Sequence, residues 1–364
     1  MNTLSQANGT FAIHLLKVLC QDNPSENVCY SPMSISSALA MVLLGAKGDT
    51  AVQICQALHL NPDEDVHQGF QLLLHNLNKP NNQKYCLTMA NRLFVENTCE
   101  LLPIEQLSFA EAAEESRQHI NMWVSKQTKG KIPDLLSEDS VDSQTRLILA
   151  NALYFQGTWC KFFEKDSTKE VPFKINKKET RPVQMMWQED TFFHAYVKEI
   201  QAQVLVMPYE GIDLNFVVLL PDQGVDISKV ENNLTFEKLT AWTKPEFMNR
   251  TELHVYLPKF KLQEDYDMNS LLQHLGILDV FNGSKADFSG MSTKENLCLS
   301  KFVHKCVVEV NEEGTEAVAA SAGKIILFCD GPDPEVFCAD HPFLFFIMHS
   351  TTNSILFCGR FSSP

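Results

Sequence analysis

The sequence lacks every feature that would mark a secreted protein, a membrane protein or a familiar type of enzyme. Its first 20 residues contain neither the basic segment nor the cleavage site of a signal peptide, and no apolar run is long enough to cross a membrane. The GxSxG, HExxH and Walker-type motifs are also missing. We therefore expect no membrane partner and no catalytic residues.

Basic residues are scarce. The chain holds 30 Lys and Arg against 45 Asp and Glu, which gives a formal net charge of -15. A protein this acidic is repelled by nucleic acid and by anionic lipid surfaces. No cluster of basic residues interrupts the pattern, so no nucleic-acid partner is expected.

Cysteine is plentiful, but its pattern disfavours two roles. The 11 cysteines are odd in number and scattered, and no close CxxC pair has a His-rich partner. A disulfide framework and a zinc site are therefore disfavoured, and the reduced thiols of a cytosolic protein fit best. We expect no metal and no other cofactor.

One stretch near the C-terminus, NEEGTEAVAASAGKIILFCD at 311–330, is poor in bulky side chains until its apolar end. A strand-like run, Lys301 to Val310, precedes it, and Gly314 in the turn can adopt a positive φ. At the strand period of two, one face is small and uncharged and consists of Thr315, Ala317, Ala319 and Ser321. Such a segment cannot nucleate a core, but it could fit between two existing strands.

A flexible Ala/Ser linker is the simpler interpretation of this stretch. A linker would lead to a second domain, however, whereas Phe337 to Pro364 is mostly apolar and strand-like. That tail has to return to the main core. The stretch is therefore predicted to be an internal loop that is tethered at both ends.

Five separated motifs make the chain resemble the serpins. NEEGTEAVAAS resembles the reactive-loop hinge of that family, and DHPFLFFI together with NSILFCGRFSSP resembles its closing strands. The other motifs are YSPMSISSALAMVLLGAKGDT, LANALYFQGTWCKFF and LPKFKLQEDYDMNSLLQHLGI, in the expected order. Within the family, the chain most resembles the intracellular ovalbumin-type clade (clade B) and, there, the proteinase inhibitor nine group.

The resemblance implies an α+β serpin fold with three β-sheets, a large central sheet A and sheets B and C, and about eight helices. It implies a single domain over residues 1–364, with an exposed reactive-centre loop at about 312–337. It further implies a monomer that resides in the cytoplasm and also in the nucleus.

The resemblance also implies which residues control the opening of sheet A. The hinge consists of Gly314, Thr315, Glu316, Ala317, Val318, Ala319, Ala320 and Ser321. The shutter, where strands part, holds Ser31, Ser34, Asn151 and His304, and Trp159 lies at the breach, where insertion begins. Taken alone, the serines could simply cap a helix, and His304 and Trp159 could be ordinary core residues.

The expected function is protease inhibition by a suicide-substrate mechanism. A target protease attacks the loop, forms an acyl intermediate, and is trapped when the cut loop inserts into sheet A before the ester is hydrolysed. The family register places the scissile bond between Phe328 and Cys329, preceded by the subsite residues Ile325, Ile326 and Leu327. A serpin-fold protein that binds without inhibiting, or that is merely cleaved as a substrate, is the alternative.

The expected partner follows from the residue before the scissile bond. Phe328 suits chymotrypsin-like serine proteases of the granzyme, chymase or cathepsin G type, whose primary pocket is a hydrophobic slot. It does not suit an Asp-directed granzyme. Leu327 leaves a lysosomal, papain-like cysteine cathepsin as a second option.

The chain departs from the family pattern in one segment. Between NRLF (Asn91 to Phe94) and RQHIN (Arg117 to Asn121), the family carries a strand, a further helix and an edge strand. Too few residues are present here for that helix and a full edge strand, and Pro103 interrupts the segment. We expect a trimmed connection at 95–116.

Overall fold

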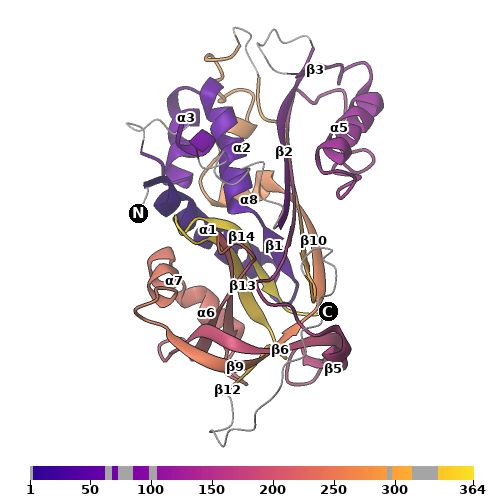
Figure 1. The fold of residues 1–364 in the computed structure, drawn as a ribbon. Coiled ribbons are helices and arrows are strands. Elements are labelled where there is room, and N and C mark those ends of the chain that lie inside the picture. The colour runs from indigo at the N-terminus through magenta and orange to yellow at the C-terminus, as the bar shows by residue number, and fades with distance from the viewer. Residues whose placement is uncertain (1–2, 62–67, 73–84, 98–104, 293–296, 314–334) are drawn as a thin grey trace, which may run out of the picture.

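A computed structural model describes residues 3–61, 68–72, 85–97, 105–292, 297–313 and 335–364, and all structural statements below concern these residues (Figure 1). They form two hydrogen-bonded sheets with helices packed against them, and α2 contacts strands of both sheets. The mixture of helices and mainly antiparallel strands confirms the expected α+β class.

The five-stranded sheet carries the candidate site. Its strand order is β10 (Phe260–Asp267), β11 (Lys301–Val310), β4 (Leu147–Gly157), β2 (Tyr85–Glu96) and β3 (Glu105–Leu107). All neighbours are antiparallel except two pairs, β11 with β4 and β2 with β3. β11 begins and ends at the residues expected from the sequence.

The nine-stranded sheet follows the order β1 (Val28–Tyr30), β14 (Ile355–Phe361), β13 (Phe343–His349), β8 (Leu214–Pro221), β7 (Ala202–Pro208), β6 (Thr180–Val197), β9 (Asn249–Pro258) and β12 (Glu335–Cys338), with β5 (Lys169–Lys174) on β6. The sequence analysis expected separate sheets B and C, whereas this region is one continuous sheet. The 18-residue strand β6 joins its halves, because it pairs with β7 at its C-terminal end and with β9 and β5 earlier.

Seven complete α-helices are described. They are α1 (Thr3–Asp22), α2 (Pro32–Gly45), α3 (Gly48–Ala57), α5 (Ala113–Gln127), α6 (Ile227–Asn233), α7 (Phe236–Trp242) and α8 (Met268–His274), with 3-10 turns at η1 (Lys165–Ser167) and η2 (Asp279–Phe281). Residues 68–72 are also helical. Within the described ranges, no helix is both long and apolar enough to span a bilayer.

Strand β4 lies at the centre of the five-stranded sheet between two layers of helices. On one face Ile148, Ala150 and Tyr154 pack with Ile120 and Val124 of α5. On the opposite face, side chains that alternate with these pack against the core that contains α2. Figure 1 shows α5 and α2 on opposite sides of this sheet. A strand covered on both faces needs apolar residues at consecutive positions, which explains the run LILANALYF, whose apolar residues are interrupted only by Asn151.

The trimmed segment leaves a minimal sheet edge. β3 has only three residues and pairs in parallel with the last residues of β2, from Phe94 to Glu96. α5 begins six residues after β3 ends. The described part of this edge is therefore only three residues long, and the expectation of a trimmed connection stays a prediction.

Candidate functional site

The site is the seam between β4 and β11, the two parallel strands at the middle of the five-stranded sheet. Nine residue pairs face each other along it, from Ile148 opposite Lys301 to Gln156 opposite Glu309. This seam is the place where a further strand could enter, since a chain that leaves the end of β11 and turns back runs antiparallel to both of its walls.

A polar cluster from α2 crosses the middle of the seam. Ser31 caps α2, because its Oγ accepts the Ser34 N–H at 3.2 Å, and Pro32 occupies the first helical turn. The same Oγ donates to the Leu356 carbonyl of β14 at 2.6 Å. Ser31 thus caps the helix, as the simpler interpretation held, and also ties it to the other sheet.

Asn151 connects this helix to the walls of the seam. Its amide nitrogen lies 2.8 Å from Ser34 Oγ, 2.9 Å from the Ser34 carbonyl and 2.6 Å from Asn91 Oδ1, so these three acceptors share its two N–H groups. Its amide oxygen bonds Nδ1 of His304, its partner across the seam. The side chains of Ser34, Asn151 and His304 are fully buried, so each needs these partners.

His304 is neutral in this setting. Burial lowers the pKa of His304 to about 3. Its Nε2 accepts the Ser31 N–H at 3.1 Å, which leaves Nδ1 to carry the proton that it donates to Asn151. A hydrogen bond between side chains therefore spans the seam and has to break if the strands part.

Two members of this cluster were missed by the sequence analysis. Asn91 of β2 lies opposite Asn151, and its amide nitrogen donates to Ser37 Oγ at 3.0 Å. Ser37 in turn donates to the Ser34 carbonyl at 2.9 Å. Two features of the sequence could have indicated these residues. Ser37 follows Ser34 by about one helical turn, and Asn91 is an amide in the mainly apolar strand ANRLF.

Trp159 lies at the end of the seam, where β11 ends and the chain leaves the sheet. It is buried, stacks on Tyr209 with ring centroids 4.5 Å apart, and donates its indole N–H to the Asn311 carbonyl at 2.8 Å. Trp159 is therefore a packed core residue, and its expected role at the breach stays a prediction. The indole holds the first residue after β11 at the mouth of the seam.

Glu312, which the sequence analysis did not single out, is the next anchored residue after Asn311. Its carboxylate bonds Lys259 Nζ at 2.9 Å and Thr168 Oγ1 at 3.0 Å, and its carbonyl accepts the Phe163 N–H at 2.9 Å. Burial raises the pKa of Glu312, but the hydrogen bonds from Lys259 and Thr168 outweigh that effect and lower it below its ordinary value. The Glu312 side chain is 8% exposed, whereas that of Lys259 is 47% exposed.

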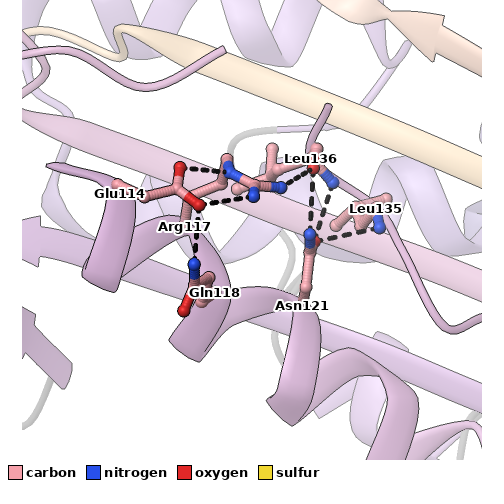
Figure 2. A network of polar contacts seen from close by, with 6 residues as sticks. All are labelled: Glu114, Arg117, Gln118, Asn121, Leu135 and Leu136. Atoms are coloured by element: carbon pink, nitrogen blue, oxygen red, sulfur yellow. Dashed lines mark hydrogen bonds and ion pairs between the residues drawn. The ribbon is translucent and has the colours of Figure 1, made fainter. Parts of the chain in front are cut away.

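The connection after α5 is fastened over the sheet by two α5 side chains. Asn121 accepts the N–H groups of Leu135 and Leu136 at 3.0 and 2.8 Å and donates to the Leu136 carbonyl at 2.9 Å. Arg117 donates to the same carbonyl at 2.9 Å and is held by Glu114 (Figure 2). α5 and its connection therefore cover the seam as one bonded unit.

β11 fastens the same connection from the sheet side. Lys305 Nζ donates to the Asp134 carbonyl at 2.8 Å, and Lys301 Nζ to the Ser140 carbonyl at 3.4 Å. Any widening of the seam has to strain or break these bonds, since they join β11 to a segment that α5 also holds.

The predicted hinge, the subsite residues and the bond between Phe328 and Cys329 lie outside the described residues. The two ends of the intervening chain are described. It leaves Glu313 beside Trp159, and it rejoins the fold at β12, where Glu335 lies opposite Leu253 of β9. The loop therefore connects the mouth of the seam to an edge of the nine-stranded sheet.

Comparison with known proteins identifies the family. The family profile described as Serpin (serine protease inhibitor) matches residues 6–364. The chain is a serpin. Human Serpin B9 is 61% identical over 377 aligned positions, and human leukocyte elastase inhibitor is 48% identical over 381, each covering 100% of both chains. The curated relatives of this serpin include the clade B members B9, B6 and B8, as the motifs predicted.

Solved structures agree with the sequence relatives. The crystal structure of uncleaved ovalbumin superimposes on this serpin with a TM-score of 0.91 at 37% identity and covers 100% of both chains. The expected serpin fold is therefore confirmed.

Proposed function

We propose that this serpin inhibits proteases by inserting its cleaved reactive loop into the seam between β4 and β11. A target protease cuts between Phe328 and Cys329 and is carried along as an acyl-enzyme. The target class is a chymotrypsin-like serine protease, on the evidence of Phe328 before the bond. We place the protein in the cytoplasm and nucleus, in line with its clade.

One observation carries this proposal: the seam is parallel, closed and directly continuous with the loop. β11 ends at Val310, and Asn311 and Glu312 are already bonded at the mouth of the seam. A strand that turns back here would form antiparallel ladders with both walls, in place of the single parallel ladder now present.

The composition of the hinge supports the same mechanism. Thr315, Ala317, Ala319 and Ser321 would all lie on one face of an inserted strand, and none carries a charge or much bulk. The inserted backbone would need partners at the shutter, where the amide of Asn151 and the ring of His304 would be released from each other. Both groups can donate and accept, so they can serve the closed and the opened sheet.

The name of leukocyte elastase inhibitor supports protease inhibition in this clade, but the target of the present chain depends on its own loop. Phe328 favours a chymotrypsin-like pocket, and Leu327 provides the competing interpretation of a papain-like cysteine cathepsin.

The test is to mix the purified protein with a chymotrypsin-like serine protease panel and, separately, with lysosomal cysteine cathepsins. We expect an SDS-stable adduct with a serine protease and release of a peptide of the mass of residues 329–364. A peptide that starts elsewhere would overturn the register. Cleavage without any adduct would replace inhibition by the substrate-like alternative.

A further inference from the structure

Two cysteines from different sheets meet behind the seam. Cys29 is the middle residue of β1 in the nine-stranded sheet, and Cys306 lies in β11, two residues after His304. Their sulfur atoms are 3.2 Å apart, although the residues are separated by 277 positions in the sequence. The structure thus places two free thiols in contact across the interface between the sheets.

From this juxtaposition we propose that Cys29 and Cys306 are a modification site, at which an oxidant forms a reversible disulfide that fastens β11 to β1. The inference does not depend on the proposed function. It concerns the closed, intact fold.

The surroundings favour a specific pair over random oxidation. Both side chains are fully buried in one hydrophobic cluster, so neither can reach a thiol of another molecule while the fold is closed. The backbone on both sides is fixed, because β1 pairs with β14 and the Cys29 N–H donates to the Tyr266 hydroxyl of β10 at 3.2 Å. Disulfide formation needs the sulfurs to approach by only about 1.2 Å.

The chemistry requires a small oxidant. Burial raises the pKa of the Cys29 thiol, so its thiolate is scarce and oxidation is slow. Hydrogen peroxide is small enough to enter as the fold fluctuates. One thiolate attacks a peroxide oxygen, the O–O bond breaks, and hydroxide leaves to give a sulfenic acid. The second thiolate then attacks that sulfur, the S–S bond forms, and hydroxide leaves again. Protons from the two thiols turn both hydroxides into water, so two electrons pass from the sulfurs to the peroxide.

The expected consequence is a more stable protein with one wall of the seam fixed. β11 could no longer move away from β1. The seam could then widen only if β4 moved away from β11. A cross-link that closes a loop this long constrains the unfolded chain strongly, and we expect a rise in Tm of about 3 to 5 °C.

The experiment uses the full chain with Cys160→Ser, because Cys160 is exposed and would otherwise link molecules. The reduced protein is treated with hydrogen peroxide, alkylated under denaturing conditions, and digested without reductant for mass spectrometry. We expect a linked peptide that joins Cys29 to Cys306, a loss of 2 Da, and a higher Tm that dithiothreitol reverses. Full alkylation of both residues, or their conversion to sulfinic acids without a linked peptide, would overturn the proposal.

Two variants test whether the rise in Tm comes from a disulfide between Cys29 and Cys306. Cys306→Ala is expected to abolish both the linked peptide and the rise in Tm. Cys358→Ala is the matched control, because Cys358 is equally buried in the adjacent strand β14, and both effects should persist there. If Cys306→Ala fails to fold, the parent protein still tests the proposal, because dithiothreitol should remove both its linked peptide and its rise in Tm. A rise in Tm that survives Cys306→Ala would contradict the assignment.

Discussion

Replacing Glu312 by Ala is expected to lower the free energy of unfolding by about 2 to 3 kcal/mol, far more than the same change at its neighbour Glu313. Glu312 is the first anchored charge after β11, and its carboxylate meets Lys259 and Thr168 at hydrogen-bond distance. The change would remove a nearly buried carboxylate and with it the acceptor for both Lys259 and Thr168.

The expected loss of stability depends on how exposed the partners of each glutamate are. A hydrogen bond to a charged group contributes about 1.5 to 3 kcal/mol when buried, and a neutral one about 1 kcal/mol. Lys259 is half exposed and regains water when Glu312 is lost, so its share lies at the lower end of that range. Glu313 pairs with Lys165, whose side chain is 63% exposed, and such surface pairs contribute less than about 1 kcal/mol.

Urea unfolding of the two Ala variants measures this difference directly. A double-mutant cycle with Lys259→Met isolates the ion pair, for which we expect a coupling of about 1 to 2 kcal/mol. Equal destabilisation by the changes at Glu312 and Glu313, or a coupling near zero, would refute the claim that Glu312 anchors the mouth of the seam.

Three further predictions concern the cover, the shutter and the hinge. Asn121→Ala should cost about 2 to 3 kcal/mol and expose the amide of Leu136 to hydrogen exchange, since three buried hydrogen bonds are lost; unchanged protection would contradict this role. His304 has a folded pKa of about 3 against 6.5 when unfolded, so its contribution is present above pH 6.5 and is lost as the pH falls toward 3. The stability advantage of wild type over His304→Gln should therefore shrink by about 2 kcal/mol between pH 7 and pH 5 in urea titrations, and a constant difference would argue against a neutral, buried ring. Thr315→Arg should turn the inhibitor into a substrate, seen on gels as cleaved protein in place of adduct, because a charge opposes the first step of insertion; an unchanged adduct yield would count against insertion.

Much of this architecture could be predicted from local patterns in the sequence. The run Lys301 to Val310 predicted the bounds of β11, and the interpretation of Ser31 as a helix cap agrees with the start of α2. Both signals are local, since strand period and helix capping depend on residues that are close in the sequence. Asn151 and His304 were identified through their motifs, and the structure adds that they bond each other across the seam.

The contacts that the sequence did not reveal join residues that are far apart along the chain. Glu312 and Lys259 both have unremarkable charged neighbours, and only the end of β11 brings them together. Cys29 and Cys306 likewise lie in separate strands, and no spacing rule pairs them. The continuity of the nine-stranded sheet was missed for a related reason, because the pairing partners of a long strand such as β6 depend on register and not on its own composition.

The central claim is that the intact protein holds a closed seam that the cut loop can fill. The most direct measurement is to cleave the loop with a non-target protease and compare the Tm of the nicked and intact proteins. Insertion predicts that the nicked protein, with its loop seated between β4 and β11, melts at a clearly higher temperature. A nicked protein that melts at the same temperature as the intact one, or below it, would contradict the account.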